Sequence, residues 1–311
     1  MAILLADVGG TNIRTAWTED GNDVRDISLS SADQYESLLD ALNAKCGADG
    51  INPDSAIIAV AGPVLGDTIN FTNRGWEFSQ TTLKSEMGLE ELLVINDFAA
   101  VALSLPSWKP GDIDYIKPGA GMANSPMLAI GPGTGLGVSA AIPSGENWIA
   151  VAGEGGHCPA VLDGLVPDIA RQRLGEQGSV TWETIISGPG LSRLHAALHN
   201  HTDRISPDEI QRDAAMGDDQ STSTVNVFSA LLGRRAADAA LLFGAWGGVF
   251  LAGGVVKALA NCFDRDAFHE EFSKHEKEFL KDVPVGILTA EYPAFSGLAY
   301  LAKVRRSLDS G

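Results

Sequence analysis

The chain has 311 residues, 45% of them hydrophobic and 20% charged, which is enough apolar material for two buried cores in a globular protein. Its formal net charge of −18 argues against nucleic acid or an anionic membrane as a partner, because both are bound through basic surfaces. Three widely spaced cysteines, Cys46, Cys158 and Cys262, form no Cys-x-x-Cys pair, so we expect neither a disulfide framework nor a structural zinc site. The first residues lack the basic region of a signal peptide and no apolar run is long enough to span a membrane, so we expect a soluble cytoplasmic protein.

The beginning of the chain predicts a hairpin with a polar tip. An apolar run at residues 3–6 is followed by Asp7-Val8-Gly9-Gly10-Thr11-Asn12 and then by a second strand-like run at residues 13–17. In one interpretation, Gly9 and Gly10 adopt positive φ and turn their amides toward an anion, while Asp7 holds a hydrated magnesium ion. In the other, the segment is only a turn, because Gly, Asn and Asp are what such turns require. The residues alone leave both interpretations open.

The rest of the first hundred residues alternates between strand-like and helix-like segments. We expect further strands at residues 24–29, 55–61, 68–71 and 92–95, and a helix at 98–105. This order predicts a mixed α/β sheet. The Pro- and Gly-containing segment at residues 107–111 is the best candidate for a domain boundary.

The second part of the chain repeats this plan in outline. A strand at residues 127–131, a glycine-rich turn at 131–137 and a returning strand at 138–142 resemble the first hairpin in design. A mostly helical stretch at 165–242 follows, then a strand at 249–252 that ends on Gly253-Gly254, a helical stretch at 258–280 and a last strand at 285–288. The apolar face of a terminal helix at 296–308 has to dock, and the first domain is the natural partner.

Three glycine turns at strand ends suggest a ligand site lined by backbone amides. No Lys or Arg occurs between Pro118 and Ala170, so an anion there depends on amides, on hydroxyls such as those of Thr11 and Thr134, and on a metal ion. The phosphate-binding pattern Gly-x-x-x-x-Gly-Lys-Ser/Thr is absent, and the glycines at 131–137 do not have the spacing of a dinucleotide site.

Several acidic and imidazole side chains are candidates for chemistry. Asp97 follows a buried strand, where it either caps a helix or faces a ligand at the carboxyl edge of a sheet. Glu154-Gly155-Gly156-His157 places an acid and an imidazole on one loop, which is either a binding loop or a surface turn. Glu183 begins a helix, where the helix dipole favours a carboxylate in any case. The other five histidines lie on polar helical stretches, and we expect them to be solvated: His195, His199, His201, His269 and His275.

Taken together, the motifs resemble those of bacterial glucokinases. They are Asp7 to Asn12, Ile95-Asn96-Asp97-Phe98, Gly133-Thr134-Gly135-Leu136-Gly137, Gly153 to His157, Ser187-Gly188-Pro189-Gly190 and Gly247 to Gly254. The resemblance implies an α/β protein with the actin-like ATPase fold, in which two ribonuclease-H-like domains, each a mixed β-sheet flanked by helices, enclose an active-site cleft. It places a small domain at residues 1–108 plus 296–311 and a large domain at 109–295.

The resemblance also implies an activity and roles for residues. The reaction is the ATP- and Mg²⁺-dependent phosphorylation of D-glucose to glucose 6-phosphate, the first step of glycolysis, by a cytoplasmic homodimer. Asp97 would be the general base, and Asp7 would hold Mg²⁺ through water. The implied glucose ligands are Asn96, Asp97, Glu154, His157 and Glu183. The implied ATP-binding residues are Ala6, Asp7, Val8, Gly9, Gly10, Thr11, Asn12, Thr134, Gly135, Gly253 and Gly254.

Two departures from the family pattern refine this hypothesis. Ala6 stands where a glycine often precedes the Asp, which crowds the turn slightly. The Cys-x-Cys-Gly zinc segment of the repressor and kinase group of sugar kinases is absent, which favours the zinc-independent branch. The alternatives are a kinase for another hexose or an amino sugar, and a sugar sensor without catalysis. An actin-like filament protein is a third, which the strong net charge disfavours.

Overall fold

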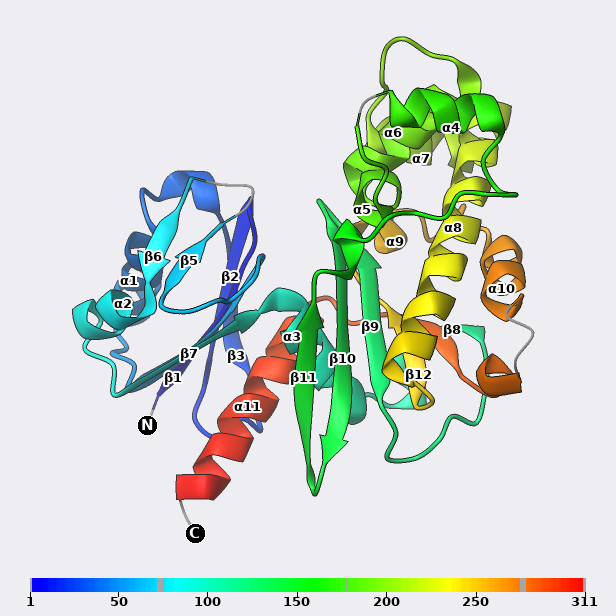
Figure 1. Ribbon diagram of the computed structural model, residues 1–311. Coiled ribbons are helices and arrows are strands. Elements are labelled where there is room, and N and C mark those ends of the chain that lie inside the picture. Colours follow the sequence, from blue (N-terminus) through cyan, green and yellow to red (C-terminus); the bar gives the residue numbers. More distant parts are fainter. Residues whose placement is uncertain (1, 72–74, 177, 275–277, 310–311) are drawn as a thin grey trace. The chain divides into compact units, whose positions relative to one another are not determined.

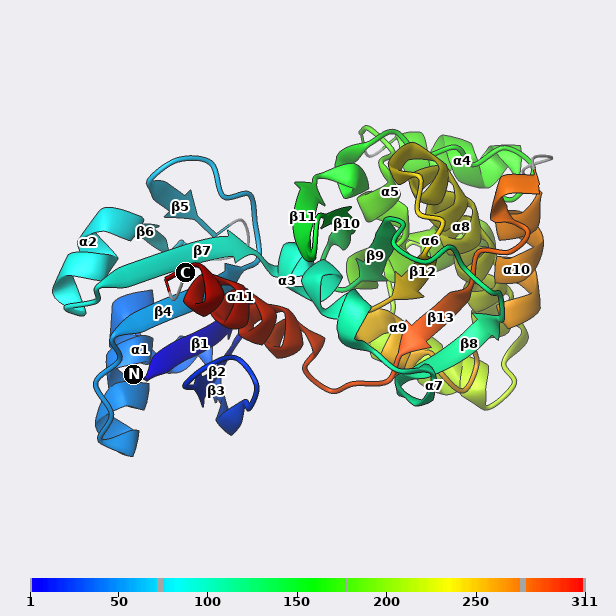
Figure 2. The same ribbon diagram turned by 90° about the horizontal axis from the view of Figure 1, so that it is seen from below.

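The computed structural model describes residues 2–71, 75–176, 178–274 and 278–309. The chain forms two compact units (Figures 1 and 2). The first comprises Met1–Trp108, Ser144–Ala152 and Ala290–Gly311, and the second comprises Lys109–Pro143 and Gly153–Thr289. In the described part of the chain, no helix is both long and apolar enough to cross a bilayer.

The first unit is built on a five-stranded mixed sheet with the strand order β3-β2-β1-β4-β7. The first three strands form an antiparallel meander, and β4 and β7 run parallel to β1. The strands are β1 (Ile3–Val8), β2 (Asn12–Thr18), β3 (Arg25–Ser31), β4 (Ser55–Val60) and β7 (Glu91–Asn96). A small two-stranded sheet of β5 (Thr68–Asn70) and β6 (Glu77–Ser79) precedes the short helix α2 (Gln80–Glu86).

Local signals in the sequence begin and end the helices of this unit. The hydroxyl of Ser37 accepts a hydrogen bond from the Asp40 amide at the start of α1 (Leu38–Asp49), and Gly50 ends that helix in the left-handed conformation. The C-terminal helix α11 (Pro293–Asp309) packs against α3 (Asp97–Ser104), as Figure 1 shows. Their backbones approach so closely that a Cβ at Gly297 would lie 1.8 Å from the Ala100 carbonyl oxygen.

The second unit repeats the same strand plan. The six-stranded sheet has the order β11-β10-β9-β12-β13-β8, in which β9 and β10 form an antiparallel hairpin and β12 and β13 run parallel to β9. The edge strand β11, except for its last residue, is counted with the first unit. The strands are β8 (Ile113–Lys117), β9 (Met127–Pro132), β10 (Leu136–Ser144), β11 (Asn147–Gly153), β12 (Gly248–Leu251) and β13 (Val285–Leu288). Apart from β8, the strands have the same order and directions as in the first sheet, which is the predicted ribonuclease-H-like arrangement.

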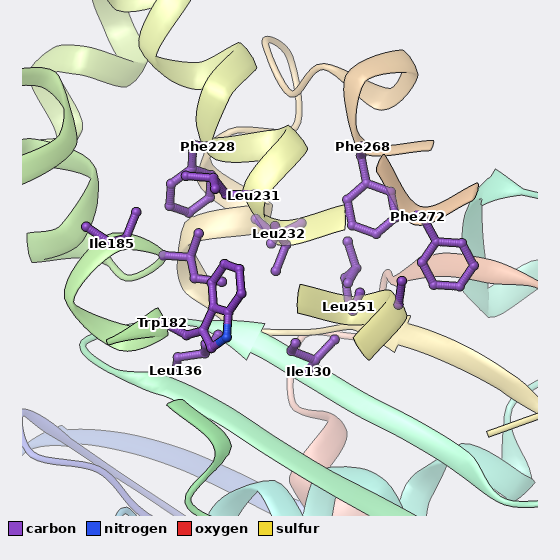
Figure 3. Close-up of a cluster of buried hydrophobic side chains, with 14 of the residues drawn as sticks. Ile130, Leu136, Trp182, Ile185, Phe228, Leu231, Leu232, Leu251, Phe268 and Phe272 are labelled. Atoms are coloured by element: carbon purple, nitrogen blue, oxygen red, sulfur yellow. The ribbon is translucent and has the colours of Figure 1, made fainter. Parts of the chain in front are cut away.

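Helices pack on this second sheet around one large apolar core. The long helix α8 contributes Phe228, Leu231 and Leu232, which meet the sheet residues Ile130 and Leu251 (Figure 3). Phe268 and Phe272 of α10 pack at one side of this cluster, and Trp182 and Ile185 of α5 complete it. The helices are α4 (Asp168–Gly175), α5 (Trp182–Ile185), α6 (Gly188–His199), α7 (Pro207–Ala215), α8 (Asp219–Phe243), α9 (Gly254–Ala258) and α10 (Arg265–Ser273).

Some sequence predictions differ from the structure. The strands β6, β8 and β11 were not expected, and the stretch 258–280 is not one helix. After α9 ends at Ala258, Asp264 caps a separate helix by accepting from the Ala267 amide at 2.9 Å. The end of the predicted stretch includes residues 275–277, which lie outside the described part of the chain.

The prediction that the other histidines are solvated is wrong for His195. This side chain is 4% exposed, and its ring stacks on that of His201 at a centroid distance of 5.4 Å. His195 Nδ1 and His199 Nε2 both lie within hydrogen-bond distance of the Thr224 hydroxyl, at 3.0 and 3.1 Å. Of the three rings, only that of His195 is buried; His199 is partly buried and His201 is exposed. His269 is exposed, and His275 lies outside the described residues.

Candidate active site

Strand β7 delivers Asn96 and Asp97 to the start of α3. The Asn96 Oδ1 accepts from the Ala99 amide at 3.1 Å, and its Nδ2 donates to the Gly62 carbonyl at 3.2 Å, so Asn96 is the helix cap. Asp97 is the first helical residue, and its Oδ1 accepts from the Phe98 amide at 2.8 Å. The capping interpretation therefore applies to Asn96, and the Asp97 carboxylate is placed at the carboxyl edge of the sheet, where ligands of α/β proteins bind.

The turn between β1 and β2 is a hairpin, but its glycines do not behave as predicted. Neither Gly9 nor Gly10 has a positive φ. The Gly9 amide donates to the Asn12 carbonyl at 2.9 Å, so this amide closes the turn. The Thr11 and Asn12 side chains are exposed. Ala6 and Val8 have fully buried side chains, so they can contribute only backbone groups to a nucleotide site.

Asp7 is paired with Arg14 across the same hairpin. The two residues lie opposite each other in the β1–β2 register, and Arg14 Nη1 is 3.0 Å from Asp7 Oδ2. Burial raises the pKa of Asp7, whereas the charge and hydrogen bond of Arg14 act to lower it. The Arg14 guanidinium also lies over the Tyr292 ring, 5.7 Å from its centroid. In the sequence, Arg14 lies as far after the turn as Asp7 lies before it, and this spacing was a signal for the pairing.

The hairpin formed by β9 and β10 lies beside the residues that follow β12. Gly253 has a φ of +94°, and a Cβ there would lie 2.5 Å from the Pro132 carbonyl oxygen, so only glycine fits both the conformation and the close approach. Gly254 is the first residue of α9. Thr134 is exposed at the tip of the β9–β10 turn, where the Gly133 amide donates to the Gly135 carbonyl at 2.8 Å. The structure thus places two of the three predicted glycine turns side by side in the second unit.

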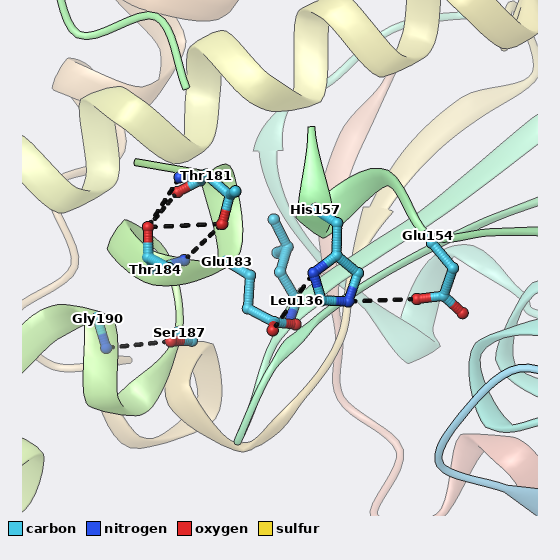
Figure 4. A network of polar contacts seen from close by, with 8 residues as sticks. All are labelled: Leu136, Glu154, His157, Thr181, Glu183, Thr184, Ser187 and Gly190. Atoms are coloured by element: carbon cyan, nitrogen blue, oxygen red, sulfur yellow. Dashed lines mark hydrogen bonds and ion pairs between the residues drawn. The ribbon is translucent and has the colours of Figure 1, made fainter. Parts of the chain in front are cut away.

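Glu154, His157 and Glu183 converge on one another in the second unit (Figure 4). His157 Nε2 is 3.7 Å from Glu154 Oε2, and His157 Nδ1 is 4.0 Å from Glu183 Oε1. Glu154 directly precedes the short 3₁₀ turn η4 (Gly155–His157), His157 is the last residue of that turn, and Glu183 comes from α5. The side chains of Glu154 and His157 are more than half exposed, at 55% and 59%. The cluster is therefore accessible and offers several polar atoms to a small polar ligand.

A backbone amide holds Glu183 in this cluster. Its Oε2 accepts from the Leu136 amide at 2.9 Å, at the start of β10. A Cβ at Gly135 would lie 2.4 Å from the same oxygen, so the carboxylate occupies space that a side chain at 135 would fill. Thr181 caps α5 and fixes the helix that carries Glu183. Sequence reasoning missed the Leu136 amide, because an interaction of a side chain with a backbone group leaves no residue-type signal.

No group of three or more His, Cys, Asp or Glu side chains with metal-binding geometry occurs among the residues that the structure describes. The remaining acidic candidate for a metal is Asp7. A partly buried carboxylate with a raised pKa is a group that a cation stabilises in the ionised form, so Asp7 fits a role beside a hydrated Mg²⁺ that is otherwise held by phosphates.

Comparison with known proteins identifies the family. A family model described as Glucokinase matches residues 4–305. The chain is 37% identical to the glucokinase of Cupriavidus metallidurans, over 99% of this chain and 95% of the relative. It is 38% identical to that of Chromobacterium violaceum, over 95% and 88% respectively. The crystal structure of a glucokinase from an Antarctic psychrotroph matches with a TM-score of 0.84 and 30% identity, over 97% of this chain and 98% of that one.

The same strand plan occurs in both sheets, and each sheet contains a hairpin with a glycine turn. These features and the match over nearly the whole length indicate the same fold and family. The prediction of the actin-like ATPase fold is confirmed, and the chain belongs to the glucokinase family.

Proposed function

We propose that the protein transfers the γ-phosphoryl group of ATP to the 6-hydroxyl of D-glucose, which gives ADP and glucose 6-phosphate in the first step of glycolysis. The observation that carries this proposal is the convergence of Glu154, His157 and Glu183. A sugar presents many hydroxyl groups, and a binding site for it needs several hydrogen-bond acceptors in fixed places. Two carboxylates around one imidazole, one of them anchored by the Leu136 amide, supply such acceptors.

The reacting hydroxyl is assigned to Asp97, with Asn96 as a further sugar ligand. Asp97 accepts the proton of the 6-hydroxyl as that oxygen attacks the γ-phosphorus, and ADP leaves in line on the opposite side. The helix cap at Asn96 supports this role, because a capped first turn fixes the backbone that carries Asp97. Phosphoryl transfer requires positioning and charge stabilisation more than covalent chemistry, which suits a site made of anchored polar side chains.

The nucleotide is assigned to the glycine hairpins. We place the ATP phosphates against residues 6–12, Thr134, Gly135, Gly253 and Gly254, and Mg²⁺ beside Asp7 through water. When bound, Mg²⁺ neutralises charge on the phosphates. The Asp7 carboxylate would orient the hydrated cation, and Arg14 opposes the rise that burial causes in the pKa of that carboxylate.

The experiment that tests the function is ADP release by the purified protein with Mg²⁺ and ATP. The sugars to compare are glucose, mannose, fructose and N-acetylglucosamine, with a control that contains no sugar. Release that depends on glucose supports the proposal. ADP release with another hexose alone would mean that this hexose is the substrate and that the reaction class is unchanged. No ADP release with any sugar would overturn the proposal.

We also propose that the enzyme is a cytoplasmic homodimer. The family resemblance suggests the dimer, and the edge strand β3 exposes Ile27 and Leu29 at 45% and 56%, where a second chain can pack. Three free cysteines and the use of ATP suit a reducing cytoplasm. Light scattering with size-exclusion chromatography tests the dimer, and a monomeric mass at micromolar concentration would contradict it.

A further inference from the structure

A buried arginine lies beneath the loop that carries Glu154 and His157. Arg235 is on α8 and is 4% exposed, and its Nη2 donates to the Gly155 carbonyl at 3.2 Å. Gly155 directly follows Glu154 and begins the turn that ends at His157. The guanidinium therefore contacts the backbone between the two side chains that we assign to the sugar.

Glycine at position 155 makes this contact possible. A Cβ there would lie 2.6 Å from Arg235 Nη2 and 3.3 Å from Val138 Cβ. At the next residue, a Cβ on Gly156 would lie 2.6 Å from the Leu136 carbonyl oxygen. The loop thus rests directly on β10 and on the guanidinium, so a change at Arg235 moves the backbone from which Glu154 and His157 project.

Ion pairing does not explain the burial of Arg235. Within the described residues, no carboxylate oxygen lies within 4.0 Å of its guanidinium, and its buried Nε has no hydrogen-bond partner. Burial lowers the pKa of Arg235, while the nearby Cys158 and Asp238 act in the opposite direction. A buried cation without a paired carboxylate is costly. An apolar side chain would fill the same core position without this cost, so the charge itself has a use at the loop.

The preceding residue, Arg234, provides a contrast. Its Nη2 pairs with Glu271 at 2.7 Å, and its Nη1 donates to the Val161 and Asp163 carbonyls at 3.1 and 2.8 Å. Arg234 therefore has a carboxylate partner and ties down a different segment, which makes it a matched control on the same helix.

We propose that Arg235 is a positioning residue for the sugar, which holds the Gly155 carbonyl and so sets where Glu154 and His157 meet the hydroxyl groups of glucose. This inference rests on the proposed function, since it takes the Glu154–His157–Glu183 cluster as the sugar site. Arg235 itself touches the loop and not the substrate, so its effect is expected on sugar binding and not on ATP binding.

The test compares Arg235→Met, Arg235→Lys and Arg234→Met with the wild-type enzyme. Glucose Kd is measured by calorimetry without nucleotide, and KM for glucose, KM for ATP, kcat and Tm are measured alongside it. We expect Arg235→Met to weaken glucose binding about tenfold or more, which is the effect of losing a hydrogen bond from a charged donor. We expect its KM for ATP to stay within about twofold, because the lost contact is on the sugar side. Arg235→Lys is expected to recover part of the affinity, and Arg234→Met to lower Tm without a change in glucose Kd.

A second variant keeps the test decisive if Arg235→Met does not fold. Gly155→Ala displaces the guanidinium without removing its charge, and we expect the same loss of glucose affinity. Its control is Gly175→Ala, a site where a Cβ meets no neighbouring atom. Unchanged glucose Kd in Arg235→Met and Gly155→Ala, or an equal loss in Arg234→Met, would overturn the inference. Absence of glucose phosphorylation by the wild type would instead count against the proposed function.

Discussion

At the scale of single residues, the Asp7–Arg14 pair shows how the hairpin prepares a carboxylate for a cation. Burial raises the pKa of Asp7, and Arg14 at 3.0 Å opposes that change. The two effects are of opposite sign, so the ionised fraction of Asp7 depends on Arg14. The Tyr292 ring contacts the same guanidinium in a cation–π arrangement, which favours the charged group at this place.

We expect Arg14→Met to move the acid limb of the activity profile to higher pH. Without the guanidinium, burial alone acts on Asp7, its pKa rises further, and the carboxylate is protonated over a wider range of pH. The measurement is kcat/KM for MgATP between pH 5 and 9, with Arg25→Met as the control, because Arg25 pairs with Glu19 on the exposed surface. An acid limb at the wild-type pH in Arg14→Met would contradict this role.

Glu183 illustrates a second dependence on a single contact. We expect Glu183→Gln to weaken glucose binding about tenfold, because the amide in its place reverses donor and acceptor at one of the two oxygens. The Leu136 amide still finds an oxygen to bond, so we expect Tm to change little. Calorimetric titration of glucose checks the first effect and thermal unfolding checks the second, and full glucose affinity in this variant would remove Glu183 from the sugar site.

At the scale of elements, α6 carries His195 and His199 against Thr224 of α8, and this cluster links stability to pH. Burial lowers the pKa of His195 and of His199. The neighbouring imidazoles lower the pKa of His195 further, whereas Asp213 and Asp218 on α7 and at the cap of α8 raise it. The folded state therefore takes up these protons at lower pH than the unfolded chain does.

We expect the free energy of unfolding to fall as the pH drops below about 6.5, the ordinary histidine pKa. Above that value both states hold these rings neutral, and the stability contributed by the cluster is fully present. Urea midpoints at pH 8 and pH 5.5 measure the effect, and His195→Gln should show a smaller difference between them. An equal pH dependence in wild type and variant would show that other groups are responsible.

The helix α1 offers a matched pair of glycines. Gly47 is an exposed interior residue whose Cβ would meet nothing, so Gly47→Ala should stabilise the protein by about 0.5–1 kcal/mol. Gly50 ends the helix at a φ of +65°, so Gly50→Ala should destabilise it by about 1–2 kcal/mol. Thermal unfolding of the two variants measures both, and shifts of the same sign would contradict the helix assignment.

At the scale of the whole molecule, the sequence predicted the repeated strand, glycine turn, strand and helix plan, because buried strands and their glycine stops are strong local signals. It missed β11, whose alternately half-buried and exposed residues give a weak apolar pattern. It also predicted one helical stretch over residues 258–280, which begins before α10, although Asp264 was a visible helix cap. Both errors concern elements at the edge of a core. Few of their side chains are buried, so their sequences show little apolar periodicity.

For the candidate site too, one part could be predicted from the sequence and another could not. Its residue types and motifs were readable in the sequence through the family resemblance. The contacts that fix them were not, because Arg235 is 80 residues from Gly155 and Glu183 is 47 residues from Leu136. Such partners become apparent only when the sheets and helices are assembled in space.

The most direct test of the proposed reaction and of the role of Asp97 is the rate of glucose 6-phosphate formation by the wild type and by Asp97→Asn. Asp266→Asn serves as the control, since Asp266 is also an acid in the first turn of a helix but is exposed on α10. We predict one glucose 6-phosphate for each ADP in the wild type, and a kcat lower by about 10²–10⁴-fold in Asp97→Asn, the usual contribution of a general base. No glucose 6-phosphate from the wild type, or a normal rate from Asp97→Asn, would contradict the account.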